Sequence, residues 1–172
     1  MPRRSSKPGP PGRTSTPQNS ALDAALRLLT RRAHSRVELG RKLARRGYEE
    51  DEIQGALTRL GELGYVNDAE FAAGHVRRRS TSLGPLALSA ELAARGVDRH
   101  TAGAAVRAFD RPAQVAAAIR LAERLCGRIR PAGYNELLDA VGARLLRRGF
   151  SPAIAREACR EVWSGTAGTS DA

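Results

Sequence analysis

Residues 39–60, LGRKLARRGYEEDEIQGALTRL, contain the pattern that decides the fold: a helix, a glycine turn and a second helix. In the first helix, Leu39 and Leu43 lie one turn apart on the same face. Gly47 ends that helix as a left-handed C-cap, because glycine adopts a positive φ at little cost. The acidic run 49–52 follows, and negative charge suits the first turn of the next helix. The buried face predicted for this second helix consists of Ile53, Ala56, Leu57 and Leu60.

The same pattern returns twice, at residues 88–109 and 141–163. The turn glycines of the three copies are Gly47, Gly96 and Gly149, at intervals of 49 and 53 residues. A further helix is predicted before each copy, at 20–33, 68–80 and 112–128. A sequence repeat of about 50 residues, in which each unit contacts mainly its neighbours, favours a row of stacked units over a single globular domain. The sequence therefore predicts an all-α fold of three tandem three-helix, helix-turn-helix-like repeats in an elongated curved array.

The boundaries follow from helix caps and from composition. Ser35 and Glu38 have the spacing of a capping box, and the other predicted N-caps are Ser20 (or Asn19), Asp98 and Ser151. Residues 1–20 carry four basic residues, no acidic ones and almost nothing to bury, which predicts a disordered basic tail. The predicted repeats are residues 21–66, 67–110 and 111–164, and residues 165–172 are expected to form a flexible C-terminus.

The overall composition supports a helical binding protein with an acidic partner. Aromatic residues make up only 4% of the chain against 41% hydrophobic residues, so Ala, Leu and Val must build the core. Tyr48 and Phe71 are assigned to packing, and Trp163 to the end of the last repeat. The 29 basic residues outnumber 18 acidic ones, and all but Lys7 and Lys42 are arginines. A formal charge of +11 predicts nucleic acid, anionic lipid or an acidic protein groove as partner.

Nothing in the sequence indicates catalytic chemistry, and we expect no enzyme and no cofactor or metal. Phosphate-binding loops, dinucleotide fingerprints, HExxH helices and GxSxG turns are all absent from the sequence. Cys159 occupies a predicted core position, and with Cys126 it forms no metal-ligand spacing. We expect a cytoplasmic protein, since no stretch reads as a secretory signal or a membrane span.

Clusters of cations on the predicted helices are the candidate binding residues. They are Arg31, Arg32 and Arg36; Arg41, Lys42, Arg45 and Arg46; Arg77, Arg78 and Arg79; and Arg144, Arg147 and Arg148. Cations near helix C-termini also stabilise the helix dipole, so part of each cluster is expected to be structural. Together the clusters are suited to follow a phosphate backbone. Reading of a specific DNA sequence is disfavoured, because the acidic run 49–52 would repel phosphate at the start of a recognition helix.

Four segments carry a resemblance to a known family. They are ALRLLTRRAHSRVELGRKLARRGY (25–48), LTRLGELGYVNDAEFAAGHVRRRS (57–80), LAARGV (92–97) and LLRRGFSPAIAREA (145–158). The stretch from Ala21 to Trp163 resembles the RecX family, regulators that bind filaments of the recombinase RecA. The resemblance implies a modulator that lies in the groove of a RecA–DNA filament and blocks filament growth, strand exchange, ATP hydrolysis and repressor cleavage.

Three classes of function remain open from the residues themselves. One is a monomeric regulator that binds the RecA filament and contacts single- and double-stranded DNA without sequence preference, away from membranes. Another is an independent nucleic-acid-binding helical module, which would bind DNA tightly alone. The third is a helical scaffold whose basicity reflects only a preference for arginine codons. Salt-dependent DNA binding and inhibition at few regulator molecules per RecA protomer would separate them.

Overall fold

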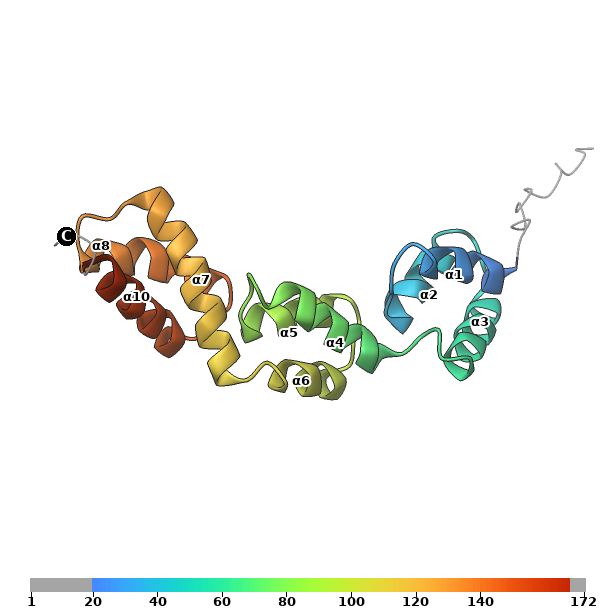
Figure 1. The fold of residues 1–172 in the computed structure, drawn as a ribbon. Coiled ribbons are helices and arrows are strands. Elements are labelled where there is room, and N and C mark those ends of the chain that lie inside the picture. The colour runs from blue at the N-terminus through green and yellow to red at the C-terminus, as the bar shows by residue number, and fades with distance from the viewer. Residues whose placement is uncertain (1–19, 168–172) are drawn as a thin grey trace, which may run out of the picture.

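The structure is a computed structural model that describes residues 20–167, with side chains described for residues 20–165. Its regular secondary structure within that range is entirely helical. The elements are α1 (Ala21–Leu29), α2 (Arg36–Ala44), α3 (Glu50–Glu62), α4 (Asp68–Arg79), α5 (Pro85–Ala94), α6 (Arg99–Arg107), α7 (Arg111–Ile129), α8 (Tyr134–Leu137), the π-helical segment η1 (Leu138–Gly142), α9 (Ala143–Arg147) and α10 (Pro152–Ala167). They form three units in an elongated, shallow arc, as predicted (Figure 1).

The predicted helix boundaries agree with the structure at most positions. Gly47, Gly96 and Gly149 end the second helix of their units with φ of 86°, 77° and 85°. Ser35 caps α2 by accepting a hydrogen bond from the Glu38 amide at 3.1 Å. Glu49 and Glu52 form a capping box at the start of α3. The buried faces follow the predicted helical spacing, and Tyr48, Phe71 and Cys159 are all buried.

Several boundaries differ from the prediction. The helix expected over 20–33 ends at Leu29, because the amide of Thr30 closes the last turn onto the Leu26 carbonyl and the chain then turns toward α2. The carboxylate of Glu38 binds the guanidinium of Arg32, whereas the predicted capping box would have it reach back to the start of its own helix. At the other end, α10 continues to Ala167, into the predicted flexible C-terminus. Residues 1–19 and 168–172 of the two predicted tails lie outside the described residues.

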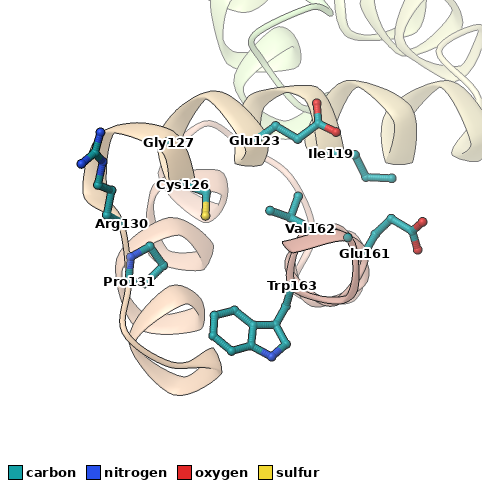
Figure 2. Close-up of a pocket in the computed structure, with 10 residues that line it drawn as sticks. Ile119, Glu123, Cys126, Gly127, Arg130, Pro131, Glu161, Val162 and Trp163 are labelled. Carbon is teal, nitrogen blue, oxygen red and sulfur yellow. The ribbon is translucent and has the colours of Figure 1, made fainter. Parts of the chain in front are cut away.

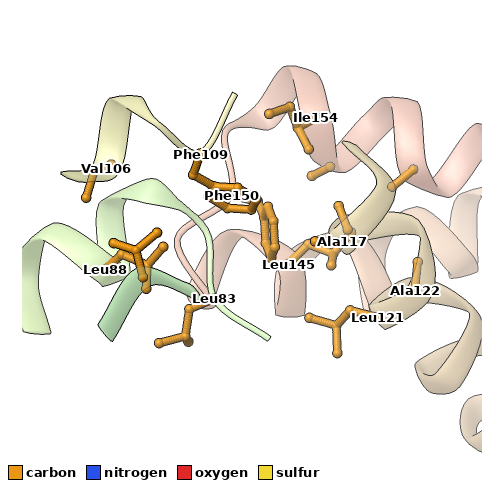
Figure 3. Close-up of a cluster of buried hydrophobic side chains, with 14 of the residues drawn as sticks. Leu83, Leu88, Val106, Phe109, Ala117, Leu121, Ala122, Leu145, Phe150 and Ile154 are labelled. Atoms are coloured by element: carbon orange, nitrogen blue, oxygen red, sulfur yellow. The ribbon is translucent and has the colours of Figure 1, made fainter. Parts of the chain in front are cut away.

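Unit one has its own hydrophobic core, whereas units two and three share one. The core of α1–α3 includes Leu39, Leu43 and Leu60, each with no measurable exposure. The second core runs without interruption from α4 to α10. Figure 3 shows this shared core, in which Phe109 of unit two lies beside Phe150 of unit three. The sequence pattern predicts three equivalent units, and the structure makes two of them one packed body.

The junction between units one and two joins the start of α2 to the turn that ends α5. The hydroxyl of Ser35, at the start of α2, donates to the carbonyl of Arg95 at 2.5 Å. Gly96 lies against Val37, where any Cβ would overlap the valine side chain. The guanidinium of Arg95 lies 3.8 Å from the carboxylate of Glu38. The turn that ends α5 thus packs on the beginning of α2.

The junction between units two and three repeats this arrangement at the same positions. The amide of Gly84, at the start of α5, donates to the carbonyl of Arg148 at 2.8 Å. The amide of Leu86 donates to the carbonyl of Gly149 at 3.2 Å. A Cβ on Gly149 would overlap Ala87, so only glycine allows this approach. In both junctions the donor is the N-cap residue of a second helix, Ser35 or Gly84. The acceptor is the backbone carbonyl of the residue that precedes the turn glycine of the next unit, Arg95 or Arg148.

The second helix of unit three is longer than the other two. The N-caps Ser35, Gly84 and Gly133 are spaced by 49 residues each. The turn glycine follows its N-cap by 12 residues in the first two units and by 16 in the third. The additional turn is accommodated by the π-helical segment η1 between α8 and α9. This insertion explains the longer second interval between the turn glycines.

Candidate protein and nucleic-acid interface

The three successive arginines at the end of α4 have different surroundings. Arg79 pairs with Glu91 of α5 through two hydrogen bonds of 2.8 and 3.2 Å. The guanidinium groups of Arg77 and Arg78 have no hydrogen-bond or ion-pair partner among the described residues. These groups lie over Gly74, where an added Cβ would sit 3.2 Å from Nη1 of Arg78. Arg79 therefore stabilises the fold, while Arg77 and Arg78 remain available to a partner.

Several cations of the other predicted clusters are also engaged within the protein. Arg36 donates to the carbonyl of Leu57 at 3.2 Å, which joins α2 to α3. Arg32 binds Glu38, which also lies 4.0 Å from Lys42. The remaining engaged members donate to backbone carbonyls: Arg41 to Ala94, Arg45 to Arg41 and Arg148 to Ser82. These contacts hold helix ends and junctions.

Six predicted binding residues are exposed, and their side chains have no hydrogen-bond or ion-pair partner among residues 20–165: Arg31, Arg46, Arg77, Arg78, Arg144 and Arg147. They are distributed over all three units, at or near the ends of α1, α2, α4 and α9. Exposed guanidinium groups lose little hydration until a partner arrives, and they pair bidentately with phosphate or carboxylate. The structure thus divides the predicted clusters into structural and available arginines.

A groove crosses the junction between units one and two. Its larger part, about 730 Å³, is lined by Arg32, Ala33, Phe71, His75, Arg78, Arg79, Glu91 and Arg95. A neighbouring hollow of about 470 Å³ shares Ala33, Phe71 and Arg78 and adds His34, Tyr65 and Arg77. We call the two together the junction groove. Tyr65 is 60% exposed, so the groove combines several guanidinium groups with an accessible aromatic ring. Such a combination suits a single-stranded nucleic acid as well as an acidic protein segment.

The buried His75 forms the floor of the junction groove. Its Nε2 lies 2.7 Å from the Glu91 carboxylate, which also accepts from Arg79. Burial lowers the pKa of His75, and the charges of Arg95 and Arg78 act in the same direction, against the hydrogen bond to Glu91. The hydrogen bond from Arg79 lowers the pKa of Glu91. At neutral pH the floor therefore carries a neutral imidazole and a negative carboxylate.

His34 also has a buried ring, with one nitrogen engaged. Its Nδ1 lies 2.9 Å from the carbonyl of Arg32, which requires Nδ1 to carry the proton. The other nitrogen, Nε2, is buried and has no hydrogen-bond partner among the described residues. Burial lowers the pKa of His34, and the nearby charge of Arg32 adds to the effect. Only one of the two ring nitrogens of His34 is therefore hydrogen-bonded.

A larger hollow of about 960 Å³ lies in unit three, between α7 and α10 (Figure 2). Cys126 and Trp163 face it from these two helices, and Trp163 packs against Tyr134 with ring centroids 6.4 Å apart. Its charged lining is mixed, with Arg130, Glu123 and Glu161. Within the described residues, no three His, Cys, Asp or Glu side chains are arranged to hold a metal ion. None of the helices in that range is long and apolar enough to cross a membrane.

The sequence interpretation missed Arg95, Glu91 and Tyr65 as parts of the junction groove. The repeat could have identified Arg95, because Arg46, Arg95 and Arg148 occupy the same position, one residue before each turn glycine. Glu91 and Tyr65 gave no comparable signal. Both line the groove only because separate helices pack together, as where Glu91 of α5 binds His75 and Arg79 of α4. Local periodicity does not encode such packing.

The chain matches known proteins over most of its length. The family model of the first three-helix domain of RecX matches residues 21–60, and that of the second matches residues 67–106. The regulatory protein RecX of Mycobacterium ulcerans (strain Agy99) is 39% identical over 153 residues, covering 86% of this chain and 88% of the relative. That of Thermobifida fusca (strain YX) is 36% identical over 168 residues, covering 94% and 91%.

Solved structures share the same architecture. The crystal structure of RecX from Lactobacillus salivarius matches with a TM-score of 0.75 at 27% identity, covering 84% of this chain and 95% of that one. A second crystal structure of regulatory protein RecX gives a TM-score of 0.71 at 23% identity, covering 78% and 68%, and shows a likeness of fold alone. The resemblance inferred from the sequence motifs is confirmed: this chain belongs to the RecX family of regulatory proteins.

Proposed function

We propose that this protein binds the RecA filament on DNA and inhibits or tunes its ATP hydrolysis, strand exchange and coprotease activity. It would act in this way in recombination, DNA repair and the SOS response. Membership of a family of regulatory proteins named RecX supports the proposal. The elongated row of units supports it too, because such a body can contact neighbouring protomers of a filament at the same time (Figure 1).

The observation that carries the proposal is the distribution of unpaired arginines. Unit one offers Arg31 and Arg46, the junction groove offers Arg77 and Arg78, and unit three offers Arg144 and Arg147. A single surface patch would suit one small acidic ligand. Cations spread along a row instead suit a partner with repeated negative charge, such as a DNA backbone or the acidic walls of a filament groove.

The proposal is tested by single-stranded-DNA-dependent ATP hydrolysis of RecA from the same species, titrated with this protein at two salt concentrations. We expect inhibition well below one regulator per RecA protomer, weakening with added salt. The double substitution Arg77→Glu and Arg78→Glu is expected to raise the concentration for half inhibition about tenfold or more, because two available cations become anions.

The matched control is Arg124→Glu with Arg128→Glu, the same change of charge on two exposed arginines of α7. It is expected to inhibit nearly as wild type does. The absence of inhibition by the wild type, together with steeply salt-dependent binding to DNA alone, would refute the proposal. That result would instead favour an independent nucleic-acid-binding module.

A further inference from the structure

The smaller part of the junction groove, the hollow of about 470 Å³, has two arginines in its wall, Arg77 and Arg78. A Cβ added to Gly74 would lie 3.2 Å from Nη1 of Arg78 and 3.7 Å from Nη2 of Arg77. The two guanidinium groups therefore converge over one glycine of α4, in space that a larger residue would fill. Neither group has a hydrogen-bond or ion-pair partner among residues 20–165. An anion bound here would be stabilised by both charges at once.

The aromatic ring of Tyr65 lies in the wall of the same hollow. Guanidinium groups pair with phosphate and with carboxylate, so the two arginines by themselves do not identify the anion. Tyr65, in the segment between α3 and α4, lines the hollow and is 60% exposed. All the other aromatic side chains of the chain are buried or half-buried. An exposed ring beside guanidinium groups is the combination that holds single-stranded nucleic acids, because bases stack on the ring while the cations bind the phosphates.

The carboxylate of Glu70 distinguishes a nucleotide from an acidic peptide. Glu70 precedes Gly74 by one turn of α4 and lines the same hollow, and its carboxylate has no hydrogen-bond or ion-pair partner among the described residues. An acidic peptide would bring further carboxylates close to Glu70, and like charges repel. A nucleotide carries its negative charge on the phosphate alone, and the edge of its base offers N–H donors that a carboxylate accepts. The lining therefore favours a ligand that is anionic at one end and flat and neutral at the other.

We propose that this hollow binds one nucleotide of a single strand of DNA. Arg77 and Arg78 hold the phosphate, and the base stacks on Tyr65. A volume of about 470 Å³ lies within the range of about 300–1,000 Å³ that is usual for small-ligand sites. The bases of a duplex are stacked and paired with one another, so the site selects a single strand. Its assignment to DNA rests on the proposed function, because the same chemistry would accept single-stranded RNA.

Substitutions of Tyr65 test whether a base stacks in the hollow. Binding of the full chain to fluorescein-labelled oligothymidylate is measured by anisotropy in the absence of RecA, and a strand of the same length that lacks bases is measured alongside. Tyr65→Leu is expected to bind oligothymidylate about tenfold more weakly and the strand without bases as the wild type does, because only the ring has been lost. Tyr65→Phe keeps the ring and should bind both strands as the wild type does. Both variants should fold, since the side chain is exposed.

Substitutions of the two arginines test whether the phosphate is held beside the base. Arg77→Ala with Arg78→Ala should weaken binding to both strands. It should also reduce the slope of log affinity against log salt concentration by about 1.4, since each phosphate contact to a single strand contributes about 0.7. Arg124→Ala with Arg128→Ala removes the same charge from the exposed side of α7 and is the matched control. This control should leave the slope nearly unchanged.

Four outcomes would overturn this nucleotide site. They are equal binding of oligothymidylate by the wild type and Tyr65→Leu, an equal loss with the strand that lacks bases, tighter binding of oligouridylate than of oligothymidylate, and displacement of oligothymidylate by polyglutamate as effective as displacement by unlabelled oligothymidylate. The last outcome would indicate an acidic protein segment as the ligand. None of them bears on the inhibition of RecA, which is absent from the assay. A wild-type protein that binds oligothymidylate through Tyr65 but does not inhibit RecA would instead overturn the proposed function alone.

Discussion

Replacing Gly84 with alanine should weaken the packing of unit three against unit two. Gly84 caps α5 at the point where the turn of unit three crosses it, and a Cβ there would overlap the carbonyl carbon and oxygen of Gly149 and the amide nitrogen of Phe150. All three are backbone atoms, so no side chain can rotate away. The turn must move, and the hydrogen bonds from Gly84 to Arg148 and from Leu86 to Gly149 would be lost or lengthened.

The expected loss of stability follows from these contacts. Forcing one methyl group into a packed site costs about 1–3 kcal/mol. Losing two backbone hydrogen bonds adds about 0.5–1.5 kcal/mol each. The free energy of unfolding of units two and three should therefore fall by about 2–6 kcal/mol, a large part of the ~5–15 kcal/mol typical of a folded domain.

Urea unfolding followed by far-UV circular dichroism and by the fluorescence of Trp163, the single tryptophan, measures this loss. Gly127→Ala is the control, because Gly127 lies on the exposed side of α7 with nothing within 4 Å of an added Cβ. It should be neutral or stabilise the same body by up to about 1 kcal/mol through helix propensity. If Gly84→Ala unfolds at the same urea concentration as the wild type, the reasoning from the close approach of Gly84 to the backbone of Gly149 and Phe150 is refuted.

Three further outcomes are expected. Leu43→Ala should destabilise unit one by about 2–5 kcal/mol, seen as an early loss of helical circular dichroism, while the Trp163 fluorescence transition stays in place because the cores are separate. Burial, aided by the neighbouring Cys126, raises the pKa of Cys159 to about 11, so a thiol reagent at mildly alkaline pH should modify the half-buried Cys126 quickly and Cys159 only on unfolding. The pKa of His75 is lowered in the folded state, so its contribution to stability is present above about pH 6.5 and declines as the pH falls. His75→Gln should reduce the acid-induced fall in urea midpoint between pH 7 and pH 5.5, and an unchanged fall would contradict this assignment.

The sequence by itself determined the helices and their order. Apolar spacing, caps such as Ser35 and Asp98, and the turn glycines are local signals, and each acts within about one helical turn of its own position. The repeated position of Gly47, Gly96 and Gly149 was enough to predict three tandem units, because each glycine must end a helix in the same left-handed conformation. The family followed from the same ordered motifs.

The tertiary structure alone decided which of the charged residues remain available. Arg77, Arg78 and Arg79 are consecutive and chemically identical, yet only Arg79 finds Glu91, because α5 folds back along one side of α4. The contact between Ser35 and Arg95 joins residues 60 positions apart. Such pairs depend on how rigid helices stack, which is set by the shapes of whole packed faces. Helix propensity and the charge pattern of the sequence do not determine that stacking. Only the folded chain therefore distinguishes arginines that hold the structure together from those that can bind a partner.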